Sequence, residues 1–320
     1  MPTAAHSFSG CACVCTVPLA SVVLEEWAAC VCHQCFRLAA RLSRCAGCKQ
    51  VGWCSPECEG VGAATHRSGG ACSECPALAR LDTDILRDGD TALAKLFVKL
   101  LCKRAAEAAA GHGGVRGGTV EQCLAALESN EEAIDEERLS DLSMIAEVVL
   151  EAVPPSARID QEVLEGYMCA EQCNSFGIWG DSGAGRGRLL GFGIFPRLCM
   201  FNHSCLPNVT ISQTVAGSVR QLSAHTLLPI AAGEELCISY SEAKLLDDRD
   251  ARRAWLRKTY CFQCACALCR ATAAEAKDMV PSFNKRWPPA TPALRTCAAA
   301  PCALGSRAST LVPDIHKRYI

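Results

Sequence analysis

Hydrophobic and polar positions follow two different periods in two parts of the chain. Between residues 76 and 165, apolar residues recur at helical spacing in "LDTDILRDGDTALAKLFVKLLCKRAAEAAA" and "TVEQCLAALESNEEAIDEERLSDLSMIAEVVLEAV". The glycine-rich "GHGGVRGG" between them predicts a loop. Residues 166–241 instead alternate short β-like runs, such as "LLGFGIF" and "ELCISY", with turn signals. These patterns predict an α+β fold with a helical segment ahead of a compact β domain.

The two ends of the chain carry weaker signals. In residues 1–29 the stretch "VPLASVVLEEW" predicts one or two short strands. The charged stretch "EAKLLDDRDARRAWLRKTY" predicts a helix that leads into a cluster of cysteines. Residues 271–320 have little periodicity, and we expect a flexible tail there.

Composition and charge narrow the possible environments. The chain has 320 residues and a formal net charge of -2, so it has no basic excess for a phosphate backbone and nucleic acid is not an expected partner. Its apolar runs are shorter than the roughly 20 residues that span a bilayer, so we expect a soluble protein without a membrane partner.

Cysteine is strongly over-represented, with 25 residues. The start "MPTAAHSFSGCACVC" has no basic region followed by an apolar one, so it does not predict a secretory signal. Thiols inside a cell stay reduced, and this many of them indicate metal sites before disulfides.

The first cysteine cluster has the spacing of zinc ligands. Each Cys-x2-Cys turn can deliver two sulfurs to a tetrahedral zinc ion, and four ligand pairs imply two ions. The candidate ligands are Cys32, Cys35, Cys45, Cys48, Cys54, Cys58, His66 and Cys72, with Cys75 as an alternative to Cys72.

This cluster resembles a MYND-type zinc finger, including the aromatic Trp53 before Cys54. In that family the pairs interleave, so the resemblance implies one zinc on Cys32, Cys35, Cys54 and Cys58, and another on Cys45, Cys48, His66 and Cys72. The chain departs from the family by having five residues, not three, between the histidine and the last cysteine.

Several later motifs resemble the lysine methyltransferases that carry both SET and MYND domains. They are "CNSF", "GFGIFP", "NHSCLPN", "GEELCISY" and "YCFQCACALC". The resemblance implies a knotted SET β-fold with small sheets. It divides the chain into an apparently truncated N-terminal part of SET (1–29), a MYND finger (30–75), a helical insert (76–165), the SET core (166–243), a post-SET zinc segment (244–270) and the tail (271–320).

The resemblance also implies site residues. Tyr240 would be catalytic, and Phe176 and Tyr260 would line a channel for the substrate lysine. Residues expected to bind S-adenosylmethionine are Asn130, Asn174, Asn202, His203 and Phe262. A third zinc, making about three per chain, would be held by Cys205, Cys264, Cys266 and Cys269, with Cys261 as a competitor for Cys205.

Two functions fit these motifs. The first is a protein-lysine methyltransferase that acts on histone or non-histone proteins in the nucleus and cytoplasm, with a MYND finger that binds a proline-rich peptide partner. The alternative is a non-catalytic zinc scaffold with a degenerate SET domain. The family begins with a Gly-x-Gly turn against the cofactor, and the first 17 residues here contain none. This omission predicts a truncated N-terminus or weak cofactor binding.

Overall fold

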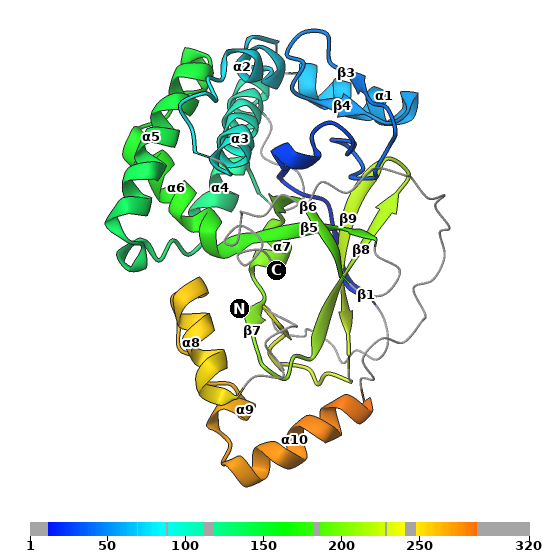
Figure 1. Ribbon diagram of the computed structural model, residues 1–320, viewed down its shortest axis with the longest axis vertical. Coiled ribbons are helices and arrows are strands. Elements are labelled where there is room, and N and C mark those ends of the chain that lie inside the picture. Colours follow the sequence, from blue (N-terminus) through cyan, green and yellow to red (C-terminus); the bar gives the residue numbers. More distant parts are fainter. Residues whose placement is uncertain are drawn as a thin grey trace.

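A computed structural model describes residues 12–286 except 69, 88, 112–117, 182–185, 228 and 241–247. Figure 1 shows a bundle of helices at the upper left, small sheets in the centre and three C-terminal helices below, the last of which lies farthest from the bundle. The α+β expectation is confirmed. Among the described helices, none is both long enough and apolar enough to cross a membrane.

The predicted helical segment folds as a bundle around one long helix. Its helices are α2 (Glu74–Arg80), α3 (Asp90–Ala110), α4 (Val120–Ala125), α5 (Glu136–Ala152) and α6 (Gln161–Asn174), with 3-10 turns η2 (Gly70–Cys72), η3 (Glu131–Ala133) and η4 (Pro155–Ala157). Capping side chains fix where several begin: Thr119 closes a capping box with Gln122, and Asp135 and Asp160 accept backbone N–H groups. The central α3 buries apolar residues along its length, which makes it the axis of the larger core.

The SET core is built from small sheets. One has the order β2-β6-β5, with β2 (Ala20–Val23), β6 (Arg186–Ile194) and β5 (Ser175–Asp181), and a second has the order β1-β9-β8, with β1 (Ala12–Thr16), β9 (Val219–Thr226) and β8 (Val209–Ala216). Two glycines of "GFGIFP" let β2 approach β6. A Cβ at Gly193 would lie 2.6 Å from the Ala20 carbonyl oxygen, and one at Gly191 would overlap the Val22 carbonyl.

Side chains occupy both outer edges of the β2-β6-β5 sheet. On the β2 side, three lysines of α3 lie one turn apart. Lys99 Nζ donates to the Ser21 carbonyl (2.8 Å) and Lys103 Nζ to the Leu19 carbonyl just before the strand (3.0 Å), while Lys95 Nζ pairs with Glu25 Oε1 just after it (2.7 Å). On the β5 side, the Gln213 amide accepts from the Trp179 N–H (3.0 Å) and donates to the Gly177 carbonyl (2.7 Å). Backbone groups that a neighbouring strand would otherwise bind are therefore paired with side chains.

The MYND segment contains the hairpin β3 (Ser43–Arg44) and β4 (Gly52–Trp53), followed by α1 (Pro56–Arg67), and η1 (Glu25–Trp27) precedes it. Ser55 caps α1 by accepting from the Cys58 N–H, with Pro56 in the first turn. Trp53 is only 2% exposed and packs edge-on to His66 at 6.2 Å between ring centroids.

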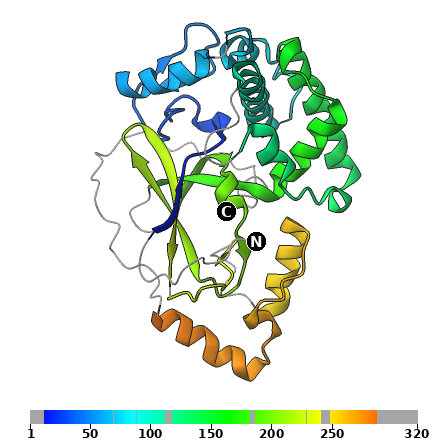
Figure 2. The ribbon, with the colours of Figure 1, turned by 180° about the vertical axis from the view of Figure 1, so that it is seen from behind.

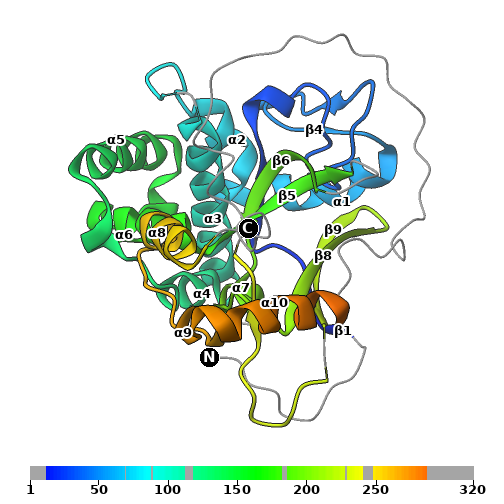
Figure 3. The same cartoon turned by 60° about the horizontal axis from the view of Figure 1, so that its bottom comes forward.

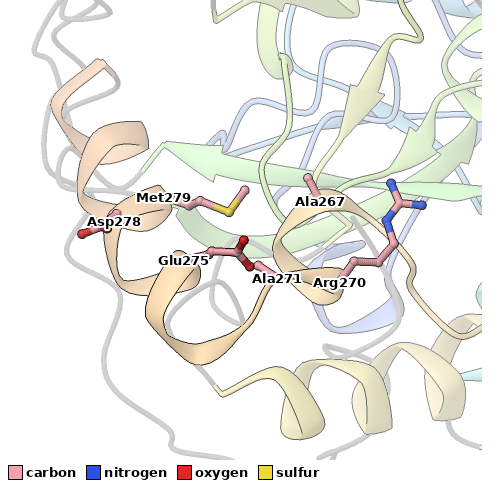
Figure 4. A pocket seen from close by; sticks show the side chains of 6 residues that line it. All are labelled: Ala267, Arg270, Ala271, Glu275, Asp278 and Met279. Carbon is pink, nitrogen blue, oxygen red and sulfur yellow. The ribbon is translucent and has the colours of Figure 1, made fainter.

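After the SET core come α8 (Arg249–Tyr260), α9 (Ala267–Arg270) and α10 (Ala273–Arg286). Figures 1 and 2 show α10 at the end of the molecule away from the helical bundle, and Figure 3, with that end turned forward, shows α10 in the foreground. Helix α10 corrects part of the expected flexible tail, because Ala276, Met279 and Val280 pack against the smaller core. An open hollow between α9 and α10 is lined by one basic and two acidic side chains (Figure 4). Residues 287–320 lie outside the described part of the chain.

Candidate active site and metal centres

Two Cys-x2-Cys turns in the MYND segment have the same local geometry. Phe36 and Lys49 directly follow the second cysteine of each turn, and both have φ of 58°. The Phe36 N–H donates to the Cys32 carbonyl, and the Lys49 N–H donates to the Cys45 carbonyl, each at 2.9 Å. This left-handed residue closes the turn so that both sulfurs point to one centre.

The first metal cluster joins the residues predicted for it. The sulfurs of Cys32, Cys35, Cys54 and Cys58 lie within 4.8 Å of one another. The Sγ atoms of Cys35 and Cys54 are 3.6 Å apart, as are those of Cys54 and Cys58. The hairpin supplies Cys54 and the first turn of α1 supplies Cys58, which produces the interleaved pairing.

The second cluster corrects one predicted ligand. It contains Cys45, Cys48, His66 and Cys75, and not Cys72. The Sγ atoms of Cys45 and Cys75 are 3.6 Å apart, and His66 Nε2 lies 3.3 Å from Cys48 Sγ. Cys72 belongs to η2, and its sulfur lies 3.2 Å from Ser156 Oγ. The 3-10 turn η2 lies between α1 and α2. With this turn in place, Cys75 and not Cys72 lies next to the other three ligands.

Charged side chains surround this second cluster. Glu74 Oε2 lies 3.4 Å from His66 Nδ1, so the histidine can offer Nε2 to a metal while its other nitrogen is oriented by a carboxylate. Arg67 donates to Cys45 Sγ at 3.8 Å and lies over the Trp53 ring. The sequence pattern gave no signal for either charged residue, because Arg and Glu at helix ends usually face solvent.

The third cluster joins the SET core to the C-terminal segment. Cys205, Cys264, Cys266 and Cys269 place their sulfurs within 4.8 Å of one another. Cys205 Sγ is 3.6 Å from that of Cys269. Cys261 is not in the cluster and instead ends α8 in a left-handed conformation.

Helix α8 supports this third cluster with two arginines. Arg252 is 7% exposed and donates to Cys269 Sγ at 3.7 Å. Arg253 donates to the carbonyls of Cys264 (3.0 Å) and Cys269 (3.1 Å). Four thiolates on one divalent metal carry a net negative charge, which the Arg252 guanidinium offsets. All three clusters have the ligand types and spacing of tetrahedral zinc sites.

The "NHSC" segment crosses the chain about 35 residues downstream. Strand β7 (Asn202–His203) pairs in parallel with β10 (Cys237–Ile238), and the short helix α7 (Pro196–Cys199) precedes it. The Asn208 side chain accepts from the Cys237 N–H (2.8 Å) and donates to the Glu235 carbonyl (2.8 Å), which fixes the crossing. Asn208 stood in the quoted motif, but nothing in the spacing indicated this role.

An aromatic cluster forms where the crossing ends. The ring centroid of Tyr240 lies 4.8 Å from that of Tyr260, 5.2 Å from that of His203 and 6.2 Å from that of Phe262. Trp255, for which the sequence pattern gave no signal, packs edge-on to Tyr260 at 5.5 Å between ring centroids. The structure therefore brings together side chains from three segments of the chain, which contribute His203, Tyr240, and Tyr260 with Phe262.

The Tyr240 hydroxyl is directed by the backbone. It donates to the Phe201 carbonyl at 2.9 Å. Burial raises the pKa of Tyr240 above its ordinary value, so the phenol is neutral at neutral pH. Phe176, the other predicted channel residue, lies in the apolar cluster against which Tyr240 packs, with its ring edge-on to Phe195 at 6.1 Å.

Both nitrogens of His203 are engaged within the protein. Nδ1 accepts from the Tyr240 N–H at 3.1 Å, and Nε2 lies 3.4 Å from Cys205 Sγ. Burial lowers the pKa of His203 to about 4, so its imidazole is neutral at neutral pH. Any contact of His203 with a cofactor is therefore left to its ring face or its backbone.

The three predicted asparagines hold neighbouring segments. Asn174 Nδ2 donates to the carbonyls of Glu128 (2.9 Å) and Ala170 (2.7 Å), which joins the "LESN" segment to the end of α6. Asn130 has φ of 48° and its amide donates to Cys173 Sγ at 3.5 Å. Asn202 Nδ2 donates to Glu235 Oε1 at 2.7 Å.

Comparison with known proteins matches both parts of the chain. The family model described as SET domain matches residues 74–241, and that described as MYND finger matches residues 32–72. The chain is 26% identical over 263 residues to histone-lysine N-methyltransferase SMYD1 of Homo sapiens, covering 78% of this chain and 49% of that protein.

Two further relatives give the same picture. Identity is 28% over 280 residues to histone-lysine N-methyltransferase SMYD3 of Mus musculus, covering 84% of this chain and 58% of the relative. It is 27% over 240 residues to N-lysine methyltransferase SMYD2-B of Xenopus laevis, covering 74% and 50%. The chain spans about half the length of these relatives. With a SET domain that fills more than half of its length and a MYND finger ahead of it, the chain belongs to the family of SET and MYND domain-containing proteins.

Proposed function

We propose that this protein is an S-adenosylmethionine-dependent protein-lysine N-methyltransferase. The observation that carries the proposal is the placement of Tyr240, whose ring packs on Tyr260 while its hydroxyl is held by the Phe201 carbonyl at the end of the β7/β10 crossing. The names of the relatives, which are histone-lysine and N-lysine methyltransferases, support the same reaction.

The residues present suit the chemistry of S-adenosylmethionine. Its ammonium group needs acceptors, and no donor among the described residues reaches the side-chain oxygens of Asn174 or Asn202. Its adenine needs an apolar face, which the partly buried Phe262 offers beside His203. We propose that Asn130, Asn174, Asn202 and Phe262 hold the cofactor by side chain, and His203 by its backbone or ring. When bound, the cofactor supplies a methyl group on a sulfonium sulfur.

The side chains around Tyr240 would prepare the substrate amine. A free lysine has a pKa of about 10.4 and is protonated at neutral pH. An apolar aromatic channel disfavours the ammonium form and so promotes loss of the proton. Because the Tyr240 hydrogen is directed to the Phe201 carbonyl, the lone pairs of its oxygen can accept an N–H of the amine and orient it toward the methyl group.

The MYND finger supplies a second binding surface. MYND domains are protein-interaction modules, and Leu38 of this finger, with 59% of its surface exposed, offers an apolar contact to a partner. We propose that the finger binds a proline-rich peptide partner while the SET domain binds the substrate protein.

The alternative is a non-catalytic zinc scaffold with a degenerate SET domain, and the names of the relatives do not favour it. Of the first 17 residues, 1–11 lie outside the described part of the chain, and Ala12–Thr16 form β1. A scaffold would keep its zinc sites without binding the cofactor.

Calorimetry with S-adenosylmethionine on zinc-loaded protein separates the two functions, and absence of binding at millimolar cofactor would favour the scaffold. If the cofactor binds, Tyr240→Phe should retain binding and lose most methyl transfer from labelled S-adenosylmethionine to a histone mixture. Unchanged transfer in Tyr240→Phe would remove Tyr240 from the mechanism.

A further inference from the structure

The imidazole of His203 bridges a metal ligand and the backbone of Tyr240. Its Nε2 is 3.4 Å from Cys205 Sγ in the third metal cluster, and its Nδ1 is 3.1 Å from the Tyr240 backbone nitrogen. The two contacts lie on opposite sides of one ring. His203 therefore connects the metal centre to the residue proposed to orient the substrate amine.

The direction of the hydrogen bonds follows from the donors. A backbone N–H can only donate, so Nδ1 must be the unprotonated acceptor. A neutral imidazole then carries its hydrogen on Nε2 and points it at Cys205 Sγ. A metal-bound thiolate accepts such a hydrogen well, because the hydrogen bond is charge-assisted.

We propose that His203 is a positioning residue that transmits metal binding at Cys205 to the backbone position of Tyr240. The thiolate held by the metal fixes the His203 tautomer, and that tautomer presents the acceptor for the Tyr240 N–H. In the opposite direction, the Nε2 hydrogen stabilises the thiolate as a ligand. Zinc in the third cluster thus sets the geometry of the aromatic cluster without entering the reaction.

Among the described residues, the other contacts around Tyr240 do not link its backbone N–H to the metal cluster, whereas the His203 contact does. The neighbouring Ser204 N–H donates to the Ile238 carbonyl (2.9 Å), which pairs the two strands but does not reach Tyr240. Within the described part of the chain, the other polar contact of Tyr240 is its hydroxyl on the Phe201 carbonyl, at the far end of the side chain. The Tyr240 N–H is therefore a local reporter of the His203 contact.

Two substitutions of His203 test its contacts with Cys205 and with Tyr240 separately. Asparagine places its oxygen near the position of Nδ1, so His203→Asn should keep the Tyr240 contact and lose the Cys205 contact. Glutamine places its amide nitrogen near the position of Nε2, so His203→Gln should keep the Cys205 contact and lose the Tyr240 contact.

The readouts are hydrogen–deuterium exchange of the Tyr240 amide and zinc release to a chromogenic chelator, both on the full zinc-loaded chain. We expect His203→Asn to release one of three zinc ions about tenfold faster, with Tyr240 exchange unchanged. We expect His203→Gln to exchange at Tyr240 about three- to tenfold faster, as for one lost hydrogen bond, with zinc release near that of the unsubstituted protein.

Removing the metal itself provides a second test of the proposal. Cys205→Ser should remove the third zinc and speed exchange at Tyr240, whereas Cys32→Ser, which removes a ligand of the first cluster, should leave that amide protected. The proposal is overturned if Cys205→Ser and Cys32→Ser affect Tyr240 equally, or if His203→Asn and His203→Gln change the same readout.

The inference rests on the proposed function only in giving Tyr240 a role in methyl transfer. Exchange and zinc release are measured without cofactor or substrate. If both behave as expected and methyl transfer is absent, the proposed function fails and the connection stands.

Discussion

The identity of the eighth MYND ligand can be tested by a matched pair of substitutions. Cys75 lies in the second cluster, with its sulfur 3.6 Å from that of Cys45. Cys72 lies three positions earlier and contacts Ser156 Oγ at 3.2 Å. Both cysteines are replaced by serine, which keeps the side-chain size and removes a soft ligand.

The structure predicts very different magnitudes. Cys75→Ser leaves three ligands, and a structural zinc site contributes on the order of 10 kcal/mol at neutral pH. Losing even about 4 kcal/mol of this should lower the melting temperature by about 8–16 °C in a domain of this size. Cys72→Ser keeps a polar contact with Ser156, so it should cost less than about 1 kcal/mol, or about 3 °C.

Zinc content by mass spectrometry and melting by scanning calorimetry measure both effects. Cys75→Ser should hold two zinc ions where the unsubstituted chain holds three, and Cys72→Ser should hold three. If Cys72→Ser loses zinc while Cys75→Ser retains it, Cys72 and not Cys75 is the fourth ligand of the second cluster.

Two further predictions concern the sheet and the aromatic cluster. Lys99→Met removes the donor to the Ser21 carbonyl and should lower the free energy of unfolding by about 1–3 kcal/mol; urea denaturation should show no such loss for Lys277→Met, whose side chain is exposed. Burial raises the pKa of Tyr240 above its ordinary 10.0, so the folded state favours the neutral phenol, and the stability this contributes below pH 10 is lost as the pH rises toward the raised value. The urea midpoint should therefore fall more steeply above pH 10 in the unsubstituted protein than in Tyr240→Phe, and equal slopes would contradict a buried Tyr240.

Metal ligands were predictable from the sequence because their spacing is set by local turns. The two Cys-x2-Cys turns need only a left-handed residue after the second cysteine, and Phe36 and Lys49 provide it. The choice between Cys72 and Cys75 was not predictable, since it depends on a 3-10 turn before α2 whose sequence, "GAC", has no distinctive signal.

The aromatic cluster was predictable only through family resemblance. The strands β7 and β10 are two residues each, too short for any period to be read, and their parallel pairing joins distant segments. Trp255 and the arginines of α8 read as parts of a charged, solvent-facing helix, because their partners belong to the zinc segment that folds back on them.

The lysines of α3 show a different limit. Three lysines at intervals of four residues usually mark a solvated helix face. Here Lys99 and Lys103 bind backbone carbonyls in and just before β2, and Lys95 binds the Glu25 carboxylate just after it. The pattern gives the helix correctly but not what its polar face contacts. Only the packing of α3 against the sheet reveals that the polar stripe is an interface.

Side chains are hydrogen-bonded to both edges of the β2-β6-β5 sheet, and this affects the tendency of the protein to associate at high concentration. An exposed strand edge is a template for pairing with another chain, and it can start aggregation or strand exchange. Here lysine ammonium groups bind carbonyls at the β2 edge. At the β5 edge, the Gln213 amide makes one donor and one acceptor hydrogen bond with the strand backbone, as a neighbouring strand would. A further strand could pair with either edge only by displacing these side chains, which disfavours edge-to-edge association although the sheet does not close into a barrel.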